Sequence, residues 1–169
     1  MSILTFSPVL KTRRNHALEH ATITILSQKY PGRRFAGHSN PTGFVILGNA
    51  PIDAVADAAA QALKRLQNGE RELAIHPGCG TNHLVSGLVG GIMAWIAMAG
   101  ARDRRDRLSR LPFVIALSVI GFILAQPLGP LAQARITTQG DPGTLVLAEV
   151  MQFNIGSVSG YRVQTRGGA

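Results

Sequence analysis

The sequence has little cysteine, few aromatic residues and few acidic ones. Its single cysteine, Cys79, excludes an internal disulfide and is consistent with a reducing compartment. Aromatic residues make up 5% of the 169 residues and are not interleaved with the basic ones. The net charge of +8 therefore predicts attraction to a membrane surface, with no nucleic acid as partner. A cleavable signal is not expected either, because residues 1–10 lead into Lys11 and further basic residues rather than into a small-residue cleavage site.

Charge is absent from two segments, residues 84–101 and 111–131. The first has 18 residues, close to the lower limit for crossing a hydrocarbon core of about 30 Å. The second begins with a 15-residue apolar run, and Gln126 and Pro127 predict that it leaves the bilayer or kinks there. A pair of buried core helices is the alternative, but too few residues remain outside these segments to cover such helices. The sequence therefore predicts a two-span hairpin with the lipid bilayer as its partner.

The orientation of this hairpin is ambiguous. The loop at residues 102–110 carries five arginines and two aspartates, which favours a cytoplasmic loop. The region before the first span also carries nine basic residues and lacks an obvious export signal, which favours cytoplasmic flanks. We expect cytoplasmic flanks in a bacterial inner membrane. In either orientation both flanks lie on one side and can fold together.

The flanks have the residue patterns of a small α+β domain. Their helices are predicted at residues 12–28 and 52–67, the first ended by Tyr30-Pro31-Gly32. Strands are predicted at residues 34–38, 42–48, 72–76, 135–139, 144–152 and 157–165. The apolar run 44–47 is typical of a strand covered on both faces. The expected organisation is an N-terminal α+β region (1–83), a transmembrane hairpin (84–132) and a β-rich tail (133–169) that packs on the N-terminal region.

The first predicted helix contains the motif H-x-x-E-H, formed by His16, Glu19 and His20. Histidines four residues apart project from one helical face, close enough to bind one metal ion. This is the reversed form of the zinc-hydrolase motif H-E-x-x-H, in which the glutamate acts as general base. We therefore predict a Zn²⁺ site with Glu19 as the catalytic residue. Two exposed histidines on an ordinary helix are the simpler alternative.

Further ligands are available at the entry to the first span, which reads HPGCGTNH. Imidazole and thiolate are preferred zinc ligands, so His76 is the first candidate for the third ligand and Cys79 the second. Glu72 ranks third, because it follows the motif at a shorter interval than in the reversed-motif proteases. His38 is expected near the site or in a turn. Cys79 as a nucleophile in a glycine-containing turn is another interpretation.

Three segments, 15–23, 37–44 and 76–82, together with the apolar hairpin, resemble an uncharacterised bacterial membrane family found in cyanobacteria and filamentous phototrophs. The resemblance implies that the three segments form one constellation, and it implies no activity. The similarity to the reversed-motif proteases covers five residues and says nothing about the fold.

Two functions from different classes follow from these observations. The first is a membrane-anchored, zinc-dependent, peptidase-like hydrolase that acts on peptide substrates near the bilayer. The second is a non-catalytic membrane subunit or assembly factor in which the metal holds the first helix to the turn before the span. A hydrogen-bonded network without metal is a third possibility. Gly87 and Gly91, in a small-x3-small pattern, are predicted to pack the hairpin against itself or against another membrane protein.

Overall fold

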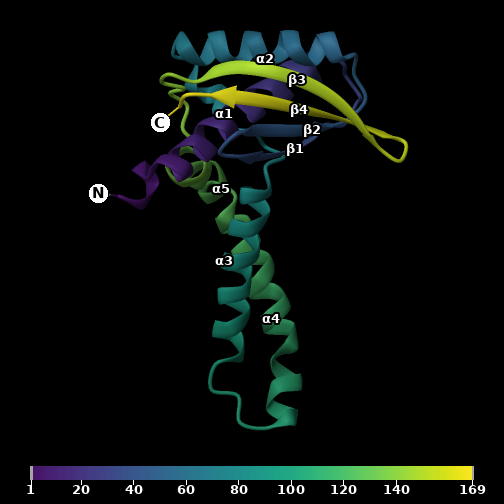
Figure 1. Ribbon diagram of the computed structural model, residues 1–169. Coiled ribbons are helices and arrows are strands. Elements are labelled where there is room, and N and C mark those ends of the chain that lie inside the picture. Colours follow the sequence, from purple (N-terminus) through teal and green to yellow (C-terminus); the bar gives the residue numbers. More distant parts are fainter. Residues whose placement is uncertain (1, 169) are drawn as a thin grey trace. The chain divides into compact units, whose positions relative to one another are not determined.

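The computed structural model describes residues 2–168 and divides into two units (Figure 1). Among the described residues, the first unit combines residues 2–76 with residues 134–168, and the second consists of residues 77–133. Helices and an antiparallel sheet occur together in the first unit, so the predicted α+β class is confirmed.

The sheet of the first unit has four antiparallel strands in the order β1-β2-β4-β3. Two strands come from before the apolar helices, β1 (Ala36–Asn40) and β2 (Gly43–Leu47). Two come from after them, β3 (Val146–Ile155) and β4 (Val158–Arg166). The two hairpins join where β2 pairs with β4, so the central strands belong to opposite ends of the chain.

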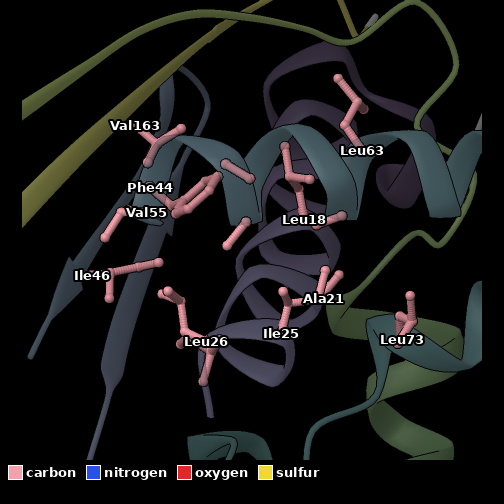
Figure 2. Packing of buried hydrophobic residues seen from close by; sticks show 14 of the residues in the cluster. Leu18, Ala21, Ile25, Leu26, Phe44, Ile46, Val55, Leu63, Leu73 and Val163 are labelled. Atoms are coloured by element: carbon pink, nitrogen blue, oxygen red, sulfur yellow. The ribbon is translucent and has the colours of Figure 1, made fainter. Parts of the chain in front are cut away.

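Two helices, α1 (Ser7–Lys29) and α2 (Ile52–Gln67), pack on each other and on the sheet, α1 against β1 and β2 and α2 against β3 and β4. Figure 2 shows the core between them, with side chains from both helices meeting those of β2 and β4. Along β2, Phe44 and Ile46 are fully buried, whereas Val45 and Leu47 are only half-buried. The prediction that this strand is covered on both faces is therefore wrong, because the helices pack on the face that Phe44 and Ile46 share.

The helix boundaries follow local signals. α2 spans the predicted residues, with Pro51 as its N-cap. α1 begins five residues earlier than predicted, at Ser7, because Pro8 in its first turn has its φ angle preset for a helix and needs no N–H partner.

Two predicted strands are wrong. Residues 71–74 form a 3₁₀ helix, η2 (Arg71–Ala74), because Leu73 and Ala74 are both buried and adjacent residues of a strand would point to opposite faces. The segment predicted as a strand at 135–139 is largely η3 (Gln133–Thr137), one π-helical turn. The carbonyl oxygens of Arg135 and Thr138 accept hydrogen bonds from Arg13, so they are not used in a ladder.

The second unit is helical, with α3 (Gly80–Met98), α4 (Arg104–Ala125) and the short α5 (Leu128–Ala132). α3 and α4 are long and apolar enough to cross a membrane, and most of their large apolar side chains are exposed. At 1.5 Å per residue their 19 and 22 residues span about 28 Å and 33 Å. α4 begins before the apolar run because Asp103 caps it, accepting from the Asp106 N–H at 2.8 Å. It ends at Ala125, where the sequence predicted an exit or kink.

Glycines set the contact between α3 and α4. A Cβ at Gly121 would lie 2.9 Å from the Cα of Gly90, so the helices touch through backbone at this point. Gly87 and Gly91 meet nothing within 4 Å of an added Cβ among the described residues. The expectation that these two glycines pack the hairpin against itself is wrong, and Gly90 takes that role.

Candidate metal site

The two motif histidines lie side by side on α1. Their ring centroids are 4.3 Å apart with an interplanar angle of 62°. His20 is 2% exposed and His16 is half-buried. The i, i+4 spacing therefore produces a pair of adjacent imidazoles at the edge of the core, and the simpler alternative of two exposed histidines is wrong.

Both imidazoles are held by backbone carbonyl groups through Nδ1. His16 Nδ1 donates to the Thr137 carbonyl oxygen at 3.0 Å, and His20 Nδ1 donates to the Ala74 carbonyl oxygen at 2.7 Å. Because a carbonyl oxygen only accepts, these contacts assign the proton to Nδ1 in each ring. In the neutral rings the lone pair is then on Nε2. Metal-binding histidines are characteristically oriented in this way.

His76 approaches the pair from the end of the segment that follows η2. Its ring centroid lies 5.7 Å from that of His20, with the planes tilted by 41°. The same segment supplies the carbonyl of Ala74, so η2 both orients His20 and delivers a third imidazole to it. A strand at 72–76 was the wrong expectation, yet the 3₁₀ turn brings His76 to the motif.

Glu19 lies against β1. Its side chain is 3% exposed, and its Oε2 accepts a hydrogen bond from the Ser39 hydroxyl at 2.5 Å. The backbone of Gly37 approaches so closely that a Cβ there would overlap the carboxylate. The carboxylate is thus buried beside an edge strand, with a glycine making room for it.

Cys79 belongs to the second unit, where it is the N-cap residue of α3 and is buried. Its thiol lies 3.4 Å from the Thr81 hydroxyl. The covalent chain limits its distance from His76, because three residues reach at most about 11 Å. The other sequence candidates are less enclosed: His38 is exposed on β1, and Glu72 is exposed on η2.

A buried amide next to the motif anchors α1 to the sheet. Asn15 is fully buried, its Nδ2 donates to the Asn40 carbonyl oxygen at 2.8 Å, and its Oδ1 accepts from the Thr165 hydroxyl at 2.8 Å. Sequence reasoning missed this role and that of Ser39. Asparagine inside a helix was the available signal, because its side chain competes with helical hydrogen bonds and needs another partner.

A cavity of about 390 Å³ opens beside the segments that orient the imidazoles. Ala74 and Thr138 line it, as do Arg71, Glu72 and Asp141. Its volume falls within the range of small-molecule sites. The walls thus combine charged side chains with Ala74, whose carbonyl oxygen accepts from His20, and with Thr138, which follows the residue whose carbonyl oxygen accepts from His16.

Comparison with known proteins identifies the relatives of this arrangement. The family described as Domain of unknown function (DUF6391) matches residues 11–150, which include the motif, β1, η2 and both apolar helices. The chain belongs to this family. An uncharacterized protein of Picosynechococcus sp. is 34% identical over 158 residues, covering 85% of this chain and 73% of its own length. No solved structure matches this DUF6391 chain.

Proposed function

We propose that this chain is a membrane-associated zinc protein in which His16 and His20 bind the ion through Nε2. The two Nδ1 hydrogen bonds to carbonyl oxygens carry the proposal, because they orient both rings and put the lone pair on Nε2, the nitrogen proposed to bind the metal. His76 is the preferred third ligand, because its ring contacts that of His20 within the first unit. Cys79, three residues later in the chain, is the next candidate.

The membrane location is supported by α3 and α4. Their lengths fit a hydrocarbon core, and large side chains such as Leu84, Trp95 and Phe113 are exposed. In water this apolar surface would be costly, whereas in lipid it is favourable. We propose the bacterial inner membrane with both flanks cytoplasmic. Gly87 and Gly91 on α3 meet nothing within 4 Å of an added Cβ among the described residues, and we propose that they contact another membrane protein.

We further propose that the activity is hydrolysis of peptide substrates near the bilayer surface. Bound zinc would lower the pKa of water and polarise a carbonyl group. Glu19, three residues from His16 and one from His20, would accept the proton from that water. Substrate would enter through the cavity beside Ala74 and Thr138. Three protein ligands leave a coordination position open, as catalytic zinc sites require.

Metal analysis of the purified full chain in detergent, combined with variants, tests this proposal. We expect about one zinc ion per chain in the unmodified protein and in Glu19→Gln, and loss of zinc in His16→Ala/His20→Ala. His38→Ala is the matched control, because it removes an exposed histidine from β1. Glu19→Gln should lose peptide cleavage. An unmodified protein that binds no zinc would contradict the metal site.

The contacts of Glu19 favour a second candidate, the non-catalytic metal-stapled subunit or assembly factor. The hydrogen bond from Ser39 and the packing on Gly37 give this carboxylate a structural role that needs no reaction. In that case both His76 and Cys79 would bind, closing the coordination sphere. X-ray absorption at the zinc edge separates the candidates, because four protein ligands indicate the subunit and three with water indicate the hydrolase.

A further inference from the structure

We propose that the N-terminal segment, residues 2–14, is an interfacial anchor that lies among the headgroups of an anionic membrane. The inference rests on the proposed membrane location of α3 and α4. It adds a surface contact made by the first unit to the span made by the second.

The segment presents large apolar side chains to solvent. η1 (Ile3–Thr5) and the start of α1 leave Ile3 76% exposed and Phe6 62% exposed. Neither residue belongs to the buried core of the first unit. Apolar side chains on a short exposed element are the usual means by which a protein inserts into the headgroup region.

Arg13 ties this segment to residues that lie next to the apolar helices in the chain. Its guanidinium donates to three carbonyl oxygens, those of Leu4 at 3.2 Å, Arg135 at 3.1 Å and Thr138 at 3.0 Å. Partial burial lowers the pKa of Arg13. The guanidinium still keeps its charge, because the pKa of an arginine lies far above neutral pH. The cation therefore acts as a fixed clamp between the N-terminal segment and residues 135–138.

The clamp determines where the segment lies relative to a bilayer. The second unit ends at Gln133, whose side-chain amide donates to the Asn82 side-chain oxygen at 2.6 Å, in the first turn of α3. Arg135 and Ile136 therefore follow within three residues of a group that lies where α3 would enter the membrane. Ile136 is itself 55% exposed. Arg13 joins Leu4 to residues 135–138 by hydrogen bonds. Ile3 and Phe6 therefore lie close to the same membrane surface.

Charge complements this apolar surface. The first acidic residue of the chain is Glu19, whereas Lys11, Arg13 and Arg14 precede it. Arg135, on η3, is exposed as well. Basic residues near an anionic leaflet are attracted to its surface. An anionic lipid surface is therefore the partner that fits both the apolar and the basic side chains.

Fluorescence quenching by brominated lipids tests the anchor. Trp95, the single tryptophan, lies on α3 and reports in the unmodified chain whether the hairpin is in the bilayer. In a Trp95→Phe background, Phe6→Trp reports on the proposed anchor. Ile155→Trp in the same background is the control, because Ile155 is also exposed (60%) and is the last residue of β3. The turn from β3 into β4 lies at the far end of the sheet from the N-terminal end of α1 (Figure 1). Each full-length chain is reconstituted in phosphatidylglycerol vesicles containing phosphatidylcholine brominated at a shallow or deep acyl position.

We expect the fluorescence of the Phe6→Trp chain to be quenched several-fold more by shallow than by deep bromines, and more than that of the Ile155→Trp chain in the same vesicles. Raising the salt concentration should reduce this quenching, because it screens the attraction of the basic residues to the lipids.

Each other outcome has a defined meaning. If the Phe6→Trp chain is quenched no more than the Ile155→Trp chain while Trp95 of the unmodified chain is quenched, the anchor alone is overturned. An unquenched Trp95 would instead contradict the membrane location itself. A blue-shifted spectrum without quenching in the Phe6→Trp chain indicates a protein contact and also overturns the anchor.

Discussion

Asn15 shows how one polar side chain positions the motif that follows it. Its amide is fully buried and joins α1 to β1 through Asn40 and to β4 through Thr165. Buried polar groups are stabilising when they are paired and costly when they lose a partner. The residue immediately before His16 is thus fixed to strands from both ends of the chain.

Replacing Asn15 by alanine should destabilise the first unit. The substitution leaves the Asn40 carbonyl and the Thr165 hydroxyl without this partner, and we expect a loss of about 2 kcal/mol in the free energy of unfolding. Urea denaturation followed by circular dichroism in mild detergent measures the change. Asn68→Ala is the control, since Asn68 is exposed at the end of α2 and should change stability by less than about 0.5 kcal/mol. Equal effects of the two substitutions would contradict the role of Asn15.

At the scale of elements, η2 and the hairpin contact are decided by close packing. η2 buries Leu73 and Ala74, and the Ala74 carbonyl then accepts the hydrogen bond from His20. In the second unit α3 and α4 approach through Gly90 and Gly121. In both cases the local backbone geometry, a 3₁₀ turn or a glycine, determines which groups come into contact.

Gly121→Val should loosen the α3–α4 hairpin. The added side chain would meet the backbone of Gly90, and overpacking of this kind costs about 1–3 kcal/mol. Thermal unfolding in detergent, followed by circular dichroism, should show a lower midpoint temperature. Gly91→Val places the same side chain in open space and serves as the control. A midpoint lowered as much by Gly91→Val would show that the contact does not depend on Gly121.

At the scale of the whole molecule, the proposed zinc ion would link folding to metal binding. Metal binding would require the neutral imidazoles of His16 and His20, so protons would compete with the ion. A ligand that binds the folded chain at one hundred times its dissociation constant stabilises it by about 2.7 kcal/mol.

Removing metal should therefore lower the thermal midpoint of the full chain by roughly 5–10 °C, from that stabilisation and the usual shift per kcal/mol for a chain of this size. Differential scanning fluorimetry with and without a chelator measures the shift, and lowering the pH should reproduce it because protons compete for the ligand atoms. The His16→Ala/His20→Ala variant should not respond to the chelator. A chelator-induced shift of the same size in that variant would place the stabilising metal elsewhere.

The sequence by itself determined the α+β class, the two apolar helices, α2, the main part of α1 and the β3–β4 hairpin. Periodicity, the length of apolar runs, proline and glycine are signals within a short stretch of sequence. They therefore specify a helix, strand or turn whatever that element later packs against. The spacing of His16 and His20 likewise determined that their rings would be neighbours, because one turn of helix separates them.

Only the tertiary structure decided what surrounds those rings. Apolar alternation in residues 72–76 could not show that Leu73 and Ala74 are buried together in a 3₁₀ turn, nor that their segment offers a carbonyl to His20. Residues 135–138 looked strand-like, but the Arg13 guanidinium, more than 120 residues away, takes two of their carbonyls. Such hydrogen bonds join residues distant in the chain and depend on packing, so no local pattern specifies them. Glu19 beside Gly37 and Ser39 was decided in the same way, by the docking of α1 on β1.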